Sequence, residues 1–81
     1  MSQLREAGRL YGPDGVLLAM VRLLEHRDGS DRWEIRLNDP APSATRTAVH
    51  PDEASARAEL DRLYAEGGRD GEWTIRRLDS E

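Results

Sequence analysis

The clearest strand pattern in the chain is Arg-Trp-Glu-Ile-Arg-Leu at residues 32–37, in which charged and apolar side chains alternate. Side chains of a β-strand point in turn to opposite faces of the sheet, so Trp33, Ile35 and Leu37 share one face. The charged residues between them share the other face. The alternation predicts a strand with one face in the core and one face open.

A second stretch with this pattern is Glu-Trp-Thr-Ile-Arg-Arg-Leu at residues 72–78. Trp73 and Ile75 repeat the inward-facing pair of the first stretch, so Arg76 is expected on the same outer face as Arg36. An Arg-Asp-Gly turn precedes both stretches, but the distance from turn to Trp differs by two residues. We interpret the similarity as shared turn and strand chemistry rather than as an internal duplication.

One helix is predicted between His50 and the pair Gly67-Gly68. His50 stands at the N-cap position, and Pro51 suits the first helical position because it has no N–H to leave unpaired. The two glycines end the helix at its C-terminal cap. Apolar residues recur at helical spacing and form a stripe that is expected to be buried, consisting of Ala56, Leu60, Leu63 and Tyr64.

Residues 16–27 are compatible with two structures. Their Leu, Ala, Met and Glu content favours a helix, which Asp14 could cap. Their surroundings favour a strand, because the turn sequence Gly-Pro-Asp-Gly at 12–15 precedes them and a second turn at 27–31 leads into the next strand. We predict a long, bent strand here, with a helix as the alternative.

The predicted order of elements is β-β-β-α-β, a small antiparallel or mixed sheet with one helix packed on one face. This is an α+β fold, and a chain of 81 residues forms a single domain, residues 1–81. We expect residues 1–7 to be frayed. Residues 38–50 are rich in Pro, Ala, Ser and Thr and are expected to form a connection, in which residues 45–49 could be a short edge strand.

The composition limits the chemistry of the chain. There is no cysteine, so we expect no disulfide, no thiolate nucleophile and no cysteine zinc site. No stretch approaches the roughly 20 apolar residues of a membrane span. The first residues also lack the pattern of a signal peptide, so we expect a cytoplasmic protein that does not contact membranes. The net charge of −4 weighs against a general affinity for nucleic acid.

The sequence contains no recognisable pattern of catalytic residues. His26 and His50 stand apart in no metal-ligand spacing, and His26 lies among charges, where a solvated histidine is expected. The chain has no lysine for a Schiff base and no Gly-x-Ser-x-Gly motif around a nucleophile. We therefore predict a protein that is not an enzyme and that needs neither metal nor cofactor.

The outer face of the sheet is the best candidate for a binding surface. If Val21 and Leu23 face inward, their neighbours face outward together with the arginines of the alternating strands. An exposed apolar patch flanked by arginines is typical of protein interfaces. We predict a protein–protein interaction module that forms a homodimer through this face or through a free strand edge. The expected partner-binding residues are Leu18, Met20, Arg22, Leu24, Arg36 and Arg76.

Two other functions are open alternatives. The same arginines could contact the phosphates of a nucleic acid, although both Trp residues are assigned to the core and leave no aromatic platform for the bases. Alternatively, a small acidic domain could inhibit an enzyme that handles nucleic acids by presenting carboxylates on its helix. These carboxylates would be Asp52, Glu53, Glu59, Asp61 and Glu66.

Overall fold

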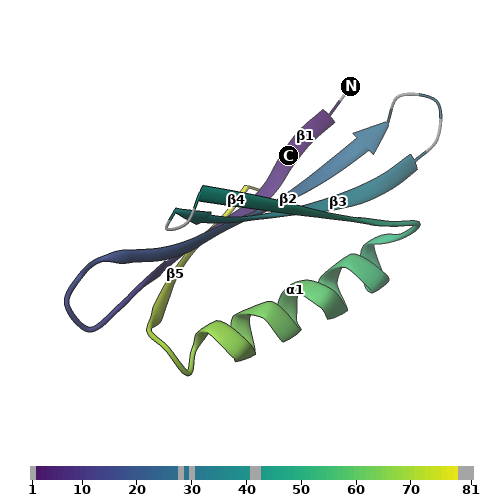
Figure 1. Cartoon of the computed structure of the whole chain (residues 1–81). Helices are drawn as coiled ribbons and strands as arrows, with labels where there is room; N and C mark the ends of the chain where they lie inside the picture. The colour runs from purple at the N-terminus through teal and green to yellow at the C-terminus, as the bar shows by residue number, and fades with distance from the viewer. Residues whose placement is uncertain (1, 28, 30, 41–42, 79–81) are drawn as a thin grey trace.

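A computed structural model describes residues 2–27, 29, 31–40 and 43–78, and shows a five-stranded sheet with one helix against one face (Figure 1). The order of elements, β-β-β-β-α-β, confirms the predicted α+β class and adds one strand to it. The bounds are β1 (Ser2–Tyr11), β2 (Leu17–Arg27), β3 (Asp31–Pro40), β4 (Ser43–His50), α1 (Glu53–Gly67) and β5 (Glu72–Arg77).

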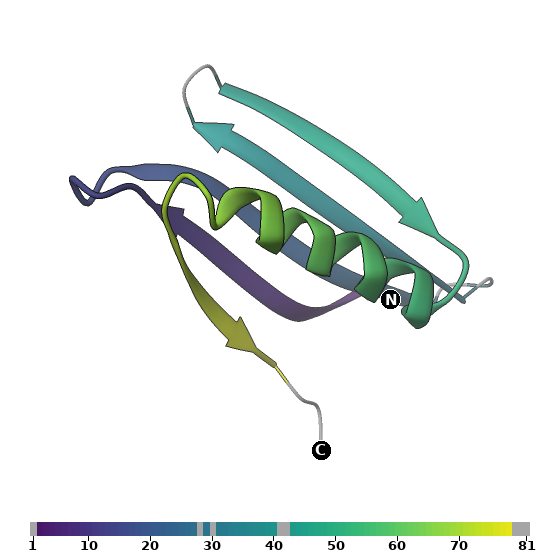
Figure 2. The same ribbon diagram turned by 90° about the horizontal axis from the view of Figure 1, so that it is seen from below.

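The sheet has the strand order β4-β3-β2-β1-β5, and every neighbouring pair is antiparallel. Strands β1 to β4 form a meander in which each strand lies beside its predecessor. The chain then leaves the edge strand β4, passes through α1 and returns as β5 at the opposite edge. Helix α1 therefore covers one face of the sheet and leaves the other uncovered, as Figure 1 and Figure 2 show.

The ambiguous segment 16–27 is a strand, since β2 occupies Leu17–Arg27. The turn before it joins β1 and β2 into a hairpin. The Gly12 N–H donates to the Val16 carbonyl over 2.8 Å, and Gly15 has a φ of 79°, which only glycine adopts at low cost. The pairing partners on both sides of β2 outweigh the helical preference of its Leu, Ala and Met.

Two segments are more regular than the sequence suggested. Residues 2–7, expected to be frayed, form the first part of β1, which pairs with β2 along its length and with β5 over its second half. Within 38–50, β3 extends to Pro40 and β4 begins at Ser43, so a full edge strand replaces the connection and includes the strand considered at 45–49. Residues 1, 41 and 42 lie outside the described residues.

Helix α1 begins two residues later than predicted. The N-cap is Asp52 and not His50, because the Asp52 backbone is extended and its carboxylate accepts a hydrogen bond from the Ser55 N–H over 2.8 Å. Pro51 therefore precedes the cap. An Asp carboxylate satisfies a free N–H of the first turn and complements the positive end of the helix dipole, which makes it the stronger cap of the two.

The core lies between α1 and the three central strands β1, β2 and β3. Trp73 stands against Tyr64 with ring centroids 5.0 Å apart, and its indole N–H donates to the Tyr64 carbonyl over 3.0 Å. Both Trp residues and Tyr64 are half-buried, as expected of side chains with one polar end. Ile75, predicted to be in the core, is 42% exposed because β5 lies at the edge of the sheet. The fully buried centre consists of Val21, Leu23, Ile35, Ala56 and Leu60.

Candidate functional site

The six predicted binding residues lie on the face of the sheet that α1 does not cover, which we call the open face. In β2, Val21 and Leu23 are buried beneath α1, so the residues that alternate with them point to the other face. The same holds in β3, where Ile35 is buried, and in β5, where Trp73 packs toward the helix. The open face accordingly carries Leu18, Met20, Arg22, Leu24, Arg36 and Arg76.

The three arginines of this set lie in one row across the open face, which we call the arginine row. Arg22 of β2 lies opposite Arg36 of β3 on one side and opposite Ala7 of β1 on the other. Ala7 in turn lies opposite Arg76 of β5. All three arginines are exposed. Arg22 and Arg36 thus place like charges directly opposite each other on neighbouring strands, an arrangement that by itself destabilises a sheet.

The small side chain of Ala7 leaves a hollow in the open face, between Arg22 and Arg76. The hollow has a volume of about 480 Å³. Leucines of β1 and β2 and the leucine that follows β5 form one part of its wall, and arginines form another. The open-face hollow is lined by Leu4, Ala7, Arg9, Arg22, Leu24, Thr74, Arg76 and Leu78.

The arginines of the hollow carry uncompensated charge. Within the described part of the chain, no carboxylate forms an ion pair with Arg9, Arg22 or Arg76. Arginine binds carboxylates and phosphates through two parallel hydrogen bonds, and it remains charged at all physiological pH values. The hollow therefore combines an anion-binding rim with apolar side chains.

Arg36 differs from the other two members of the arginine row, because it is paired. Its Nε donates to Glu34 over 2.6 Å, and the second oxygen of Glu34 lies 2.6 Å from Nε2 of His26. The hydrogen bond from Arg36 lowers the pKa of Glu34 despite partial burial of the carboxylate. His26 is 7% exposed and not solvated as predicted, since it packs against Glu34. The accessible positive charge thus lies around the hollow rather than at Arg36.

Sequence reasoning identified part of this site. Arg22, Leu24 and Arg76 line the hollow as members of the predicted set, whereas Leu18 lies outside it. Met20 lines a smaller depression of about 230 Å³ beside Arg36, in the next part of the open face. The residues that were not anticipated come from the first and last segments of the chain. These are Leu4, Ala7, Arg9, Thr74 and Leu78.

The opposite side of the sheet holds a buried carboxylate, Glu6 of β1, which is 1% exposed. Both of its oxygens accept hydrogen bonds from Arg57 of α1, over 3.0 and 3.1 Å, and one also accepts from the Tyr64 hydroxyl over 2.6 Å. Arg77 of β5 donates over 3.2 Å. Burial alone would raise the pKa of Glu6, but these donors outweigh it and lower the pKa. Glu6 is therefore held as an anion that joins three elements, which is a structural role.

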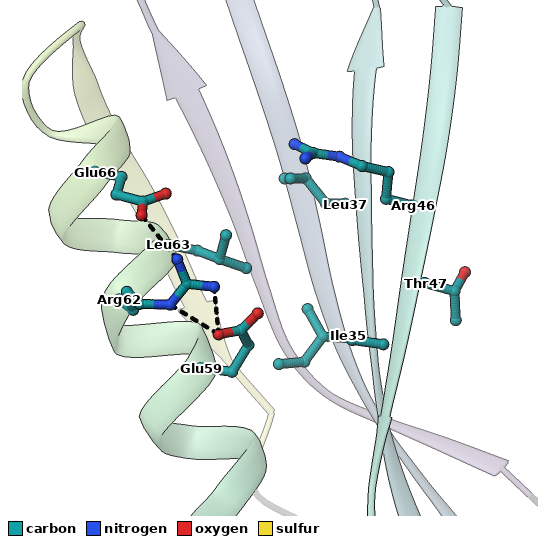
Figure 3. A pocket seen from close by; sticks show the side chains of 9 residues that line it. Ile35, Leu37, Arg46, Thr47, Glu59, Arg62, Leu63 and Glu66 are labelled. Carbon is teal, nitrogen blue, oxygen red and sulfur yellow. Dashed lines mark hydrogen bonds and ion pairs between the residues drawn. The ribbon is translucent and has the colours of Figure 1, made fainter.

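A groove separates α1 from the edge strand β4, as Figure 3 shows. Its volume is about 220 Å³, and its apolar lining includes Ile35, Leu37 and Leu63. On the helix side, Arg62 bridges two carboxylates, donating to Glu59 over 2.6 Å and to Glu66 over 2.8 Å. The β4 side consists of Arg46, Thr47 and Ala48.

The described residues form neither a metal site nor a membrane-spanning helix. No group of three or more His, Asp or Glu side chains there is arranged to hold a metal ion. No helix in the described ranges combines the length and the apolar character that a membrane crossing requires. His50 has a buried Nε2 atom without a hydrogen-bond partner, but no nucleophile or carboxylate of the described residues is bonded to it.

Comparisons with known proteins give no further assignment. No protein-family model, curated protein or solved structure matches the chain.

Proposed function

We propose that this protein is a non-catalytic protein–protein interaction module whose open sheet face binds an acidic surface of another protein. The observation that carries the proposal is the open-face hollow, in which Arg9, Arg22 and Arg76 lie beside apolar side chains and have no ion-pair partner among the described residues. Arginines next to partly buried leucines favour a protein surface that offers carboxylates beside apolar side chains.

The charge of the open face also bears on self-association. A symmetric dimer formed through this face would bring the arginine row of one copy toward the arginine row of the other, which costs free energy by like-charge repulsion. An acidic partner removes this repulsion. We therefore assign the open face to a different protein and look for the contact between two copies elsewhere.

Nucleic-acid binding is the second candidate, because the arginine row could also contact phosphates. Two features weigh against it. Trp33 and Trp73 both lie on the helix side of the sheet, so neither can stack a base on the open face. The chain also has a net charge of −4, which repels a polyanion at long range.

The inhibitor alternative rests on the carboxylates of α1, and most of them are already engaged. Asp52 caps the helix, and Glu59 and Glu66 are paired with Arg62. Among the predicted carboxylates, only Glu53 and Asp61 neither cap the helix nor form an ion pair with a described residue. Two separated charges are a weak basis for mimicking a nucleic acid, so this alternative is the least supported of the three.

A photocrosslinking experiment tests the proposal. A photoreactive residue placed at Ala7 in the hollow should capture a specific protein in an extract of the native host. Capture should be lost when Arg22→Glu and Arg76→Glu are combined, since the charge of the hollow is then reversed. It should persist in Arg69→Glu, a matched charge reversal in the turn between α1 and β5.

Two outcomes would contradict the proposal. If the Arg22→Glu/Arg76→Glu variant captures the same protein as the unchanged chain, the arginines do not determine binding. If capture disappears after nuclease treatment of the extract, a nucleic acid and not a protein occupies the face.

A further inference from the structure

The edge strand β4 has one side of its backbone unpaired within the described part of the chain. It pairs with β3 on the other side over all of its eight residues, Ser43–His50. Figure 2 shows β4 along the outer edge of the sheet. Thr45, Thr47 and Val49 on its open-face side are exposed. A long edge strand of β-branched residues readily pairs with another strand.

The strand β4 has few of the features with which proteins protect a sheet edge. Apart from its terminal histidine, Arg46 is its one charged residue, and no proline interrupts Ser43–His50. The opposite edge strand β5 is shorter, with six residues, and three of them are charged. Charged residues and short length are the usual means of preventing edge pairing, and β5 has both to a greater degree than β4, whose eight residues include the single arginine Arg46.

We propose that two copies of the chain pair through β4 in antiparallel orientation and form one continuous ten-stranded sheet. The pairing that we infer places Thr47 opposite Thr47 of the second copy, at the two-fold axis. Thr45 then lies opposite Val49 of the second copy. Pairs of β-branched residues and Thr–Thr pairs stabilise neighbouring strands. Moving the axis to Arg46 would instead set two arginines opposite each other.

Charge complementarity supports the same register. With Thr47 at the axis, Arg46 lies opposite Ala48 of the second copy, on the face that carries α1. Ala48 lines the groove between β4 and α1 together with Glu59, so the Arg46 side chain can extend over this small residue toward Glu59 and Glu66 of the other helix, two carboxylates that share the single cation of Arg62. Arg46 is free to do so, since its side chain is 72% exposed and its contact with Asp39 is long, at 3.8 Å.

The pairing also explains the groove that α1 leaves open. In this register both helices lie on the same face of the joined sheet, because residues opposite each other across antiparallel strands share a face. Each copy contributes one groove, whose apolar lining includes Ile35, Leu37 and Leu63. Both grooves then lie next to the contact between the two β4 strands, and each is partly covered by the other copy. The open faces of the two copies stay accessible. The inference is thus independent of the proposed function of that face.

The test is a charge-swap experiment with sedimentation equilibrium or light scattering as the readout. The unchanged chain should be a dimer at high micromolar concentration. Thr47→Glu and Thr47→Lys should each be monomeric, because like charges meet at the axis. An equimolar mixture of the two variants should form a mixed dimer, which unfolding of the variants could not produce. Thr74→Lys on β5 is the matched control and should remain dimeric.

A cysteine variant provides a second readout. The chain contains no cysteine, so Thr47→Cys introduces a single thiol into each copy. Opposed residues of antiparallel strands have Cα atoms about 4.5–5.5 Å apart, within the range of a disulfide. Oxidised Thr47→Cys should become a covalent dimer, while Thr74→Cys should not.

The proposal fails if the unchanged chain is a monomer at high micromolar concentration. It also fails if Thr47→Glu and Thr47→Lys are each as dimeric as the unchanged chain. If the chain is a monomer and its β4 binds an extended peptide of the acidic partner, this edge pairs with a strand of another protein and not with a second copy. Loss of partner capture at Ala7 in dimeric protein would contradict only the proposed function of the open face.

Discussion

At the scale of single residues, Glu6 is the side chain on which the contact between β1, α1 and β5 depends. Replacing it by Gln removes the anion that Arg57, Arg77 and Tyr64 share. Because breaking a buried charge network leaves its donors poorly paired, we expect Glu6→Gln to lower the free energy of unfolding by about 2–3 kcal/mol. Urea denaturation measures this change. Glu59→Gln, at a surface ion pair of α1, is the control and should change stability by less than about 1 kcal/mol.

Arg9 allows a prediction about the hollow that the sequence did not suggest. It lines the open-face hollow beside Arg22, and it makes no ion pair with a described residue. We expect Arg9→Glu to weaken partner capture at Ala7 as strongly as Arg22→Glu, with little effect on the melting temperature because Arg9 is exposed. Capture that is equal to that of the unchanged chain would remove Arg9 from the site.

At the scale of secondary-structure elements, the start of α1 can be tested at its cap. Asp52→Ala deprives the Ser55 N–H of its acceptor and should lower the free energy of unfolding by about 1 kcal/mol. Asp52→Asn and Asp52→Ser keep a capping oxygen and should recover most of this loss. Thermal or urea unfolding compares the three variants. Equal stability of Asp52→Ala and Asp52→Asn would show that the cap contributes nothing.

The elements differ in how far the sequence could predict them. The strand around Trp33 and the helix around Leu60 were predictable, because an alternating or a helical apolar pattern is a local property. The strand β4 was anticipated only as a short edge strand at 45–49, since a segment of Pro, Ala, Ser and Thr has no such pattern and becomes a full strand by pairing with β3. The segment that forms β1 also has no such apolar pattern, so the sequence did not indicate the roles of Glu6 and Arg9.

The candidate site was predictable only where its strands were. Arg22 and Arg76 follow from alternation with buried neighbours. The place of Ala7 in the hollow, by contrast, depends on the register between strands, which sets it between these two arginines. Sequence spacing within one strand cannot give the register between strands, because that depends on turns, bulges and long-range pairing. The hollow is therefore a property of the assembled sheet.

At the scale of the whole molecule, several carboxylates on both faces of the sheet make stability depend on pH. Burial would raise the pKa values of Glu6 and Glu25, but hydrogen bonds from arginines outweigh it, so both values lie below the ordinary 4.5. The hydrogen bond from Arg36 likewise lowers the pKa of Glu34. A carboxyl group with a lowered pKa in the folded state stabilises the fold above its unfolded-state pKa and loses this contribution as pH falls through the folded-state value.

Because these pKa values are lowered in the folded state, the protein is predicted to lose stability in acid. These carboxylates should leave the free energy of unfolding nearly constant from about pH 8 to pH 6, and it should fall progressively below about pH 5 as the unfolded chain takes up protons first. Because Glu6→Gln removes one of the titrating groups, the variant should start lower and fall less steeply in acid. Urea titrations at a series of pH values measure both slopes. Parallel curves for the two proteins down to about pH 3 would mean that the arginines around Glu6 do not hold its charge, and that another interaction joins β1, α1 and β5.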